Sequence, residues 1–333
     1  MTIRVSGNFW LAVLLSVVIA ASAWVARSVP ADLLPAPERP YQGYGNPAVR
    51  MEGDRYPRHA TGTDEVRIRI DGPPRRIVSQ GSHSDEYLYA VVPPARVVGV
   101  SETAYEPRLS NVYDDVQRYR PIVASDPERV LLANPDLVFT PQSARADVPN
   151  LLRRAGVPVY RMFTMFETLA SIEDHIRLTG YLTGDGERAD AEARRFRGAI
   201  DRAAARRRGS KQSPRVLGLG GTYSYGTKTL FTDILRTLGA ENVAATHGLV
   251  GYDRATDEQI VRWDPDWIVA GANHGFVDQA RARLLARPAI AATSAAHSGH
   301  IVVLDNRVFL PLSPFTSQLV EALADALYSG EDR

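Results

Sequence analysis

The chain has 333 residues, of which 44% are hydrophobic and 23% charged, and these values indicate a globular protein with about two domains of ordinary size. Its formal net charge is +1, so the overall charge gives no indication of a nucleic-acid partner. The sequence contains no cysteine, which excludes disulfides, thiolate metal sites, a cysteine nucleophile and a lipid anchor on an N-terminal cysteine.

An uncharged apolar run covers residues 9–26 and follows Arg4. Its length is near the lower limit for spanning a bilayer and exceeds the core of most signal peptides. We therefore expect residues 1–30 to be either a cleaved signal peptide, with an acceptable cleavage motif at 21–23, or a retained membrane anchor. Both alternatives predict a periplasmic or other extracytoplasmic location for the rest of the chain.

Residues 31–63 are rich in proline and glycine without apolar periodicity, and we interpret them as a linker without packed structure. The alternating run at 66–70 predicts a half-buried strand at a sheet edge. Residues 64–165 then form the predicted N-terminal lobe. Its strands are expected at 76–79, 96–100, 137–140 and 158–162, with helices at 85–90, at Glu128 and at 148–155.

Residues 166–210 are expected to form a helical connection, with helices at 168–182 and 187–208. The second would be roughly 33 Å long at 1.5 Å per residue. Its narrow apolar stripe comprises Ala189, Ala193, Phe196, Ile200 and Ala204. Its many arginines suggest a nucleic-acid or membrane-surface patch, but no aromatic residues interleave with them, so a solvated helix face is the preferred interpretation.

Residues 211–333 form the predicted C-terminal lobe. Strands are expected at 214–219, 267–270 and 300–305, and residues 241–244 are expected to lead to a further strand. Helices are expected at 230–238, around Glu258 and at 314–328, with a loop at 220–227 and a long segment at 247–254. Because strands alternate with helices in both lobes, the predicted fold class is α/β. We expect two lobes with central, mainly parallel sheets, joined by a single long α-helix.

One stretch occurs twice in the chain, at 126–140 and again at 256–270. Glu128 aligns with Glu258 and Asp136 with Asp266, and both pairs lie 130 positions apart. Each copy predicts a short helix that ends before an Asx-Pro turn and leads into a buried strand. A glutamate in a first helical turn also suits the helix dipole, which is the simplest explanation for either acid alone. Their equivalence instead predicts two related lobes that each present one acid at the same corner.

Motifs for common enzyme chemistries are absent, including GxSxG, HExxH and the phosphate-binding glycine loops. No two histidines are paired four residues apart on a convincing helix. We therefore predict no catalytic residues, no resident metal site and no cofactor of the protein's own.

Loops that follow parallel strands are where open α/β sheets bind ligands. The candidate ligand-binding residues in these loops are His83, Tyr105, Arg145, Tyr223, Tyr225, His247, Tyr252 and His274. Tyrosine and histidine offer apolar area with a polar tip, and both ligate iron, so they suit a metal chelate. The alternative for any one of them is an ordinary surface residue.

Taken together, residues 64–330 resemble the periplasmic substrate-binding proteins of ABC importers for iron–siderophore complexes, haem and cobalamin, the class III type with a helical backbone. The sequences that carry this resemblance are PRRIVS at 74–79, VVGV at 97–100, NPDLV at 134–138, LGAENV at 238–243 and DPD at 264–266, together with the long helix and the two glutamates. The resemblance implies a shallow ligand cleft between two rigidly joined lobes. It also implies that Glu128 and Glu258 dock onto arginines of a permease dimer.

The expected function is therefore capture of a metal chelate and its delivery to an ABC importer by a monomeric protein that is not an enzyme. A ferric siderophore is favoured, because cobalamin binders of the family often have a tryptophan where this chain has Ile122-Val123. Haem or cobalamin remains the alternative ligand. An exported chelatase-like enzyme and a ligand sensor without an importer are the alternatives from other classes, the sensor being held to the membrane by the N-terminal helix.

Overall fold

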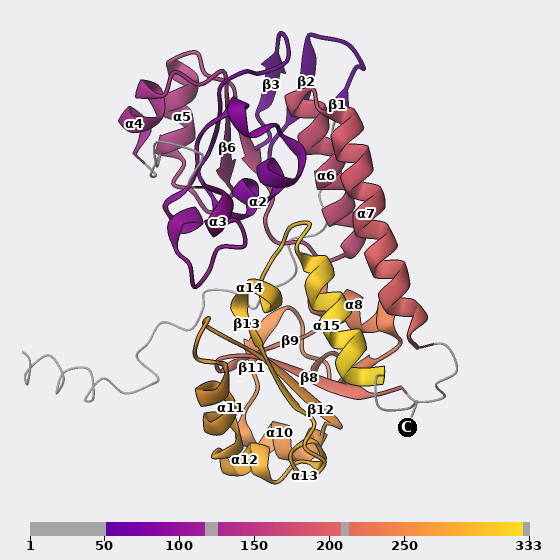
Figure 1. Ribbon diagram of the computed structural model, residues 1–333. Helices are drawn as coiled ribbons and strands as arrows, with labels where there is room; N and C mark the ends of the chain where they lie inside the picture. The colour runs from indigo at the N-terminus through magenta and orange to yellow at the C-terminus, as the bar shows by residue number, and fades with distance from the viewer. Residues whose placement is uncertain (1–50, 117–125, 208–212, 329–333) are drawn as a thin grey trace, which may run out of the picture. The chain divides into compact units, whose positions relative to one another are not determined.

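A computed structural model describes residues 51–116, 126–207 and 213–328 (Figure 1). These residues belong to one compact unit that spans Gly43–Arg333. The predicted export segment at 1–30 and most of the predicted linker at 31–63 lie outside the described residues. Within residues 51–328, apart from the two gaps, no helix is long and apolar enough to cross a membrane.

A small antiparallel sheet with the order β1-β2-β3 precedes lobe one. Its strands are β1 (Met51–Glu52), β2 (Arg58–Thr61) and β3 (Arg67–Ile70). The prediction of an alternating edge strand at 66–70 is confirmed, because exposed and buried residues alternate along β3 and it pairs with β2 alone among the described strands. The prediction of an unpacked linker is wrong for residues 51–61. Residues 51–52 pair with 59–60, residues 58–61 pair with 67–70, and Ala60 is buried in the main core.

Lobe one has a four-stranded parallel sheet with the order β5-β4-β6-β7. The strands are β4 (Ile77–Ser79), β5 (Val97–Gly99), β6 (Leu137–Pro141) and β7 (Val159–Met162), and the helices are α2 (Ser82–Val91), α3 (Tyr113–Val116), α4 (Pro127–Leu132) and α5 (Asp147–Arg154). The 3-10 turns η2 (Pro94–Arg96) and η3 (Glu102–Tyr105) flank β5. Strands such as β6 are apolar without alternation because helices cover both faces.

The connection between the lobes contains two helices that lie side by side, α6 (Leu169–Thr183) and α7 (Gly186–Ala205), where a single long helix joining the lobes was predicted. The longer helix, α7, corresponds to the predicted one. Thr168 caps α6 by accepting a hydrogen bond from the Ser171 backbone N–H, and Gly184 ends it in the left-handed conformation. α7 buries Ala189, Ala193, Phe196 and Ile200 as predicted. The last position of the predicted stripe is wrong: Ala203 is buried and Ala204 only partly buried, since the helix turns by 3.6 residues and not four.

Several arginines of α7 and its C-cap residue Arg206 pair with acids of the same chain. Arg197 binds Glu173 of α6, Arg195 binds Glu192 one turn away, and Arg206 lies 2.9 Å from Asp325 of α15. These pairs support the interpretation of a solvated helix face.

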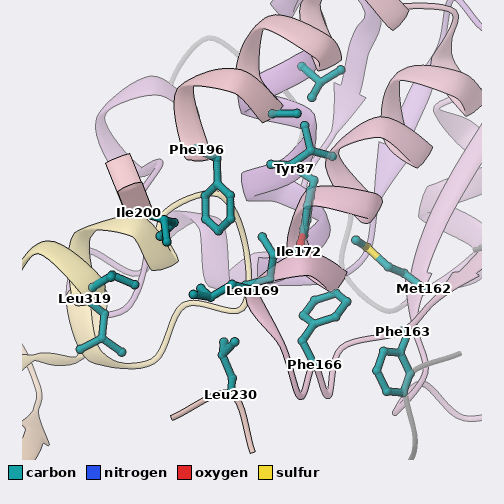
Figure 2. Close-up of a cluster of buried hydrophobic side chains, with 14 of the residues drawn as sticks. Tyr87, Met162, Phe163, Phe166, Leu169, Ile172, Phe196, Ile200, Leu230 and Leu319 are labelled. Atoms are coloured by element: carbon teal, nitrogen blue, oxygen red, sulfur yellow. The ribbon is translucent and has the colours of Figure 1, made fainter. Parts of the chain in front are cut away.

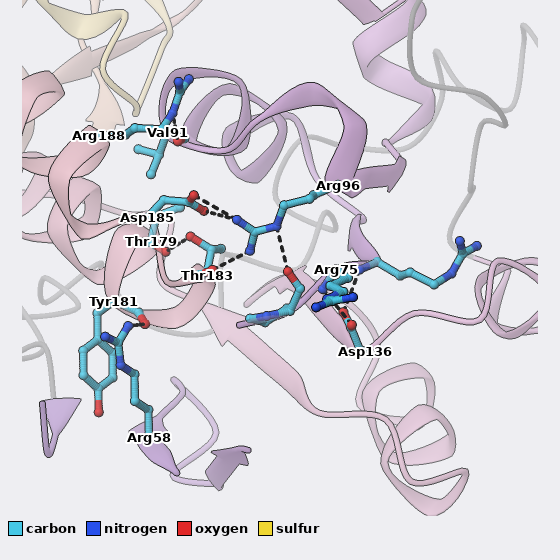
Figure 3. A network of polar contacts seen from close by, with 12 residues as sticks. Arg58, Arg75, Val91, Arg96, Asp136, Thr179, Tyr181, Thr183, Asp185 and Arg188 are labelled. Atoms are coloured by element: carbon cyan, nitrogen blue, oxygen red, sulfur yellow. Dashed lines mark hydrogen bonds and ion pairs between the residues drawn. The ribbon is translucent and has the colours of Figure 1, made fainter. Parts of the chain in front are cut away.

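Polar contacts join lobe one to the helical connection (Figure 3). The Arg96 guanidinium lies 2.8 Å from the carboxylate of Asp185, the N-cap residue of α7, and donates to the carbonyl of Thr183 at the end of α6. It also donates to the Pro74 carbonyl at 2.7 Å, which fixes the entry into β4. One guanidinium therefore holds the first strand of the lobe to the turn between α6 and α7.

Lobe two repeats the parallel core as β10-β8-β12-β13 and adds an antiparallel ribbon, β9-β11. The strands are β8 (Arg215–Gly220), β9 (Tyr223–Tyr225), β10 (Glu241–Asn242), β11 (Tyr252–Arg254), β12 (Trp267–Ala272) and β13 (Ile301–Asp305). The expected loop at 220–227 is thus partly wrong, since it contains β9, and the long segment at 247–254 contains β11. Residues 241–244, expected to lead to a strand, instead contain the two-residue strand β10, and α9 begins at Val243.

The helices of lobe two are α8 (Leu230–Leu238), α9 (Val243–Thr246), α10 (Asp257–Trp263), α11 (Val277–Leu285), α12 (Pro288–Ala291), α13 (Ser294–His297), α14 (Asn306–Phe309) and α15 (Thr316–Tyr328). The main apolar cluster includes Tyr87 of α2, Phe196 of α7, Leu230 of α8 and Leu319 of α15 (Figure 2). The two lobes and their connection therefore share one continuous core, in agreement with the predicted α/β fold of two lobes.

Candidate functional site

The ribbon β9-β11 forms the wall of an apolar cavity of about 450 Å³ at the carboxyl end of β8. Tyr225 and Tyr252 are register partners, as are Tyr223 and Arg254. Because register partners and residues two apart share a face, these four side chains lie on the same face of the ribbon. The cavity is closed by Met165 and by apolar residues of α8, of α14, of the segment between α14 and α15, and of α15, which are Leu230, Phe231, Ile234, Phe309, Leu310, Pro311, Leu312 and Leu319.

Two glycines in β8 make room for this wall. A Cβ added to Gly220 would lie 2.5 Å from the Tyr225 hydroxyl oxygen, and one added to Gly218 would lie 2.6 Å from the Phe231 ring. Tyr225 therefore fills the space beside the strand and stacks edge-on against Tyr252, with ring centroids 5.6 Å apart. Burial raises the pKa of Tyr225, and the neighbouring Tyr252 raises it further, so Tyr225 stays protonated at neutral pH.

Tyr223 lies at the open rim of the cavity, and Arg254 lies beside it without lining the cavity. Tyr223 is 48% exposed, and the Arg254 guanidinium carbon lies 6.0 Å from the centroid of its ring. This geometry places a cation beside phenol groups at the mouth of the cavity.

A second cavity of about 250 Å³ adjoins the first, since Leu310 and Pro311 line both. Its polar wall comes from lobe one and includes His83 and Glu86 of α2, together with Asn111. Asn111 donates to Glu86 at 2.8 Å, and burial raises the pKa of Glu86 to about 7. Burial lowers the pKa of His83 to about 4, so the ring is neutral at physiological pH.

The structure brings together only part of the predicted ligand set. Tyr223, Tyr225 and Tyr252 line the apolar cavity, and His83 lines the adjoining one. The remaining candidates, Tyr105, Arg145, His247 and His274, line neither of these two cavities.

Each of these four has another environment. The Tyr105 hydroxyl donates to the Val116 carbonyl, and its ring packs on the main core. Arg145 pairs with Asp147 at 3.0 Å, and His247 stacks on Trp263 of α10. His274 Nδ1 lies 2.6 Å from a carboxylate oxygen of Asp305. These side chains therefore contact neighbours within their own lobes.

Sequence reasoning missed the segment from Asn306 to Pro311, which supplies a wall to both cavities. The signal present was an apolar stretch with two prolines between the last strand and the last helix, too irregular to assign to either. Glu86 was also missed, since a single glutamate in a helix is most simply a surface residue. No cluster of three or more metal-ligating side chains occurs within the part of the chain that the structure describes.

Glu128 and Glu258 are both exposed in the first turns of α4 and α10. Asp126 caps α4 by accepting from the Glu128 backbone N–H at 2.9 Å, whereas Thr256 and Gln259 form a capping box on α10. Hydrogen bonds from the backbone N–H of Glu258 and from Thr256 lower the pKa of the Glu258 carboxyl. Both acids are therefore accessible at the surface.

The turn after each of these helices is also built alike. Asn134 and Asp264 both adopt positive φ angles, 46° and 40°. Asp136 then accepts from the Arg76 backbone N–H at 2.8 Å, and Asp266 accepts from that of Arg215 at 3.0 Å. In each lobe the same arginine donates its side chain to the last carbonyls of the helix. The sequence repeat thus specifies the same turn from helix to strand in both lobes, and we call this turn the corner.

A family model described as periplasmic binding protein matches residues 77–308. A cobalamin-binding protein of Halobacterium salinarum is 26% identical over 303 residues, covering 85% of this chain and 78% of that protein. The periplasmic heme-binding protein RhuT from Roseiflexus sp. RS-1 is 26% identical, with a TM-score of 0.63 over 77% of this chain and 98% of its own. A possible iron-binding periplasmic solute-binding protein from Staphylococcus epidermidis shares the fold, with a TM-score of 0.68 at 19% identity over 77% of this chain and 100% of its own.

Proposed function

Because the chain belongs to the periplasmic binding protein family, we propose that it captures a metal tetrapyrrole outside the cytoplasm and delivers it to an ABC importer. The observation that carries this proposal is the aromatic wall of the ribbon β9-β11, where three tyrosines and an arginine share one face. Flat apolar chelates are bound by such walls, because rings stack on them and bury apolar area.

An iron tetrapyrrole fits this wall better than a ferric hydroxamate. The larger cavity is lined mainly by aliphatic and aromatic side chains, whereas a siderophore presents polar groups that need many hydrogen-bond partners. The heme-binding relative and the cobalamin-binding relative support the same ligand class. A ferric siderophore, favoured by the sequence, becomes the second candidate.

Within this class we favour ferric haem over cobalamin, because a phenolate is an established ligand of haem iron. Tyr252 and Arg254 lie two residues apart on β11, so a cation is available near the phenol that would hold the metal. The adjoining cavity, with Glu86, Asn111 and the neutral His83, would take the polar periphery of the ligand.

The test is a titration of residues 51–333 with hemin, cyanocobalamin and a ferric hydroxamate siderophore, followed by fluorescence quenching and visible absorbance. We expect hemin to bind with a dissociation constant below about 10 µM, and Tyr252→Phe to weaken it by at least tenfold, about 1.4 kcal/mol. Tyr105→Phe is the matched control, since its hydroxyl bonds to the Val116 carbonyl, and it should leave both affinity and spectrum unchanged. Binding of the siderophore alone would overturn the tetrapyrrole assignment and leave the family unaffected.

Export is the second part of the proposal, and the family supports an extracytoplasmic location. Residues 9–26 are apolar enough to act as a signal or as an anchor. Mass spectrometry of the mature chain tests this part. A mature N-terminus at Trp24 or Asp32 supports a cleaved signal, and a full-length chain in the membrane fraction supports the anchor.

Delivery to a permease dimer is proposed from the two exposed acids. Ion pairs at the rim of an interface set its register and steer association, and each alone contributes little affinity. A single monomer would present Glu128 from one lobe and Glu258 from the other. We propose no catalytic role for the protein, and turnover of a chelate by the purified chain would contradict this.

A further inference from the structure

Lobe one contains a cavity of about 700 Å³, lined by both polar and apolar side chains, that is separate from the two cavities already described. It lies where β4 and β6 end, with α4 and α5 beside it. These two strands are the point where the strand order of the lobe reverses, since β4 is followed by β5 on one side and β6 on the other. In open α/β sheets this point is where ligands bind.

Two polar side chains of this cavity have no hydrogen-bond partner. Thr140 is fully buried, and its hydroxyl oxygen has none within residues 51–328 as far as the structure describes them. The same holds for both amide atoms of Gln80. Buried polar groups in folded proteins are nearly always paired, and these three unpaired buried atoms belong to two residues that line one cavity, which makes the cavity a candidate binding site.

The strand register explains why the two side chains point the same way. Ser79 pairs with Phe139, so Gln80 lies opposite Thr140 one step further along the parallel strands. On the same face, two residues earlier, Val78 and Val138 pack in an apolar cluster with residues of α4 and α5. The apolar layer therefore ends at Gln80 and Thr140, and a polar space begins there.

Lobe two provides the internal comparison. Because Arg76 corresponds to Arg215 and Asp136 to Asp266, the counterparts of Gln80 and Thr140 are Leu219 and Ala270. Leu219 and Ala270 also pair with each other in the sheet and are buried in an apolar cluster. The same position of the same supersecondary unit is thus filled in lobe two and open and polar in lobe one.

The charge at the cavity indicates the kind of ligand. Arg145 and Arg154 line it, and so does Asp147, which pairs with Arg145 at 3.0 Å. Arg154 is exposed and its cation adds to the hydroxyl and amide groups, which can donate as well as accept. We propose that this cavity is a second ligand site, separate from the chelate site, which binds a small metabolite carrying carboxylate or phosphate oxygens.

The site is tested with metal-free citrate and inorganic phosphate as probes, by calorimetry and by the shift in thermal unfolding midpoint. We expect at least one of them to bind in the millimolar range or tighter and to raise the midpoint in proportion to the logarithm of its concentration. Citrate binding without phosphate binding identifies a carboxylate ligand, and the reverse identifies a phosphate ligand. Failure of both below about 10 mM overturns the proposal.

Thr140→Val and Gln80→Leu separate a binding role from a structural one. Each should weaken the probe at least tenfold without lowering the unfolding midpoint of the ligand-free protein, because each removes an unpaired buried polar group. Thr140→Ser keeps the hydroxyl and should retain binding. A lower midpoint in the ligand-free Thr140→Val protein would mean that the hydroxyl has a structural partner, which overturns the proposal. Hemin affinity measured on the same variants should stay within about twofold, so failure of this proposal can be distinguished from failure of the chelate proposal.

Discussion

The two lobes share one corner, the turn from a helix into a sheet strand, and differ at the carboxyl ends of their strands. At the corner, the turn from helix to strand in both lobes has a left-handed residue, an aspartate that caps the first strand and an arginine that binds the end of the helix. At the carboxyl ends of the strands, lobe two adds the aromatic ribbon β9-β11, whereas lobe one has the cavity beside Gln80 and Thr140. The same turn is therefore used in both lobes, whereas each lobe presents a different surface for ligands.

The largest effect is expected from reversing the charge of the two exposed glutamates near the shared corner. Glu128→Arg combined with Glu258→Arg should abolish uptake in cells, because the permease arginines would meet like charges. Ligand affinity of the purified variant should stay within about twofold. Folding should also survive, since both acids are exposed.

A matched control for this experiment is Asp257→Arg, which changes an exposed acid next to Glu258 that pairs with Arg287. Uptake should persist in this variant. If the double variant unfolds or loses its ligand, the two acids have a structural role and the docking proposal loses its main support.

The capping aspartates allow a finer comparison of the two corners. Asp136 accepts from two backbone N–H groups, of Arg75 and Arg76, whereas one such bond, from Arg215, is made to Asp266. Asp266→Ala should therefore cost about 1.5–3 kcal/mol of unfolding free energy, the contribution of one hydrogen bond to a charged group, and Asp136→Ala, which removes two, should cost about 3–6 kcal/mol. Thermal and urea unfolding of the pair provide the measurement, and a larger loss in lobe two would reverse our ranking.

The next largest effect is expected from exchanging equivalent residues at the carboxyl ends of the strands between the two lobes. Leu219→Gln places an amide in the filled apolar cluster of lobe two and should cost about 2–4 kcal/mol in free energy of unfolding, because no partner is available there. Gln80→Leu, the reverse exchange in lobe one, should leave the free energy of unfolding unchanged or raise it. Urea denaturation of both variants measures this contrast, and equal losses in the two would show that the lobes do not differ in this way.

Titration of Glu86 offers a comparison within the adjoining cavity. Its pKa is raised from 4.5 to about 7, chiefly by burial, so the folded state binds the proton more tightly than the unfolded state. The contribution to stability is therefore fully present below pH 4.5 and lost as the pH rises through 7, by about 3 kcal/mol at 1.4 kcal/mol per pKa unit.

Other groups beside Glu86 titrate in the same range. Asp85, with its pKa raised to about 6 by burial, acts in the same direction between pH 3.8 and 6. His83, with its pKa lowered to about 4, acts in the opposite direction, and its contribution is lost as the pH falls from 6.5 to 4. The stability of Glu86→Gln relative to wild type should thus rise between pH 5 and 7.5. A constant difference across this range, measured by urea denaturation, would contradict the raised pKa.

The smallest expected change in the free energy of unfolding comes from substituting Leu132. This side chain of α4 is 85% exposed and lies one turn from Glu128, whereas the corresponding position in the repeat is Arg262. Leu132→Arg should change the free energy of unfolding by no more than about 0.5 kcal/mol, because it removes no buried contact. Uptake should nevertheless fall several-fold if α4 meets the permease, and unchanged uptake would remove Leu132 from the docking surface.

The repeat and the period of apolar residues were sufficient to predict the parallel core, because buried strands and Asx-Pro turns leave a local signature. Tyr223, Tyr225 and Tyr252 were predicted within a set of eight candidate ligand-binding residues, because these lie in loops that follow strands. Tyr105 and His247 follow strands too, yet a carbonyl in one case and Trp263 in the other occupy their side chains. Such partners depend on tertiary contacts that the sequence does not reveal. The ribbon was missed because its three-residue strands are too short to show alternation.

The small sheet at the start of the described chain has a mechanical consequence. Tyr181 of α6 donates its hydroxyl to the Glu52 carbonyl at 2.6 Å, and the Arg58 guanidinium lies over its ring and donates to its carbonyl (Figure 3). A pulling force applied to the chain before Met51 would therefore reach the helix α6 first, through β1 and β2. Since β1 has only two register pairs, this contact would yield before the central sheets bear any load.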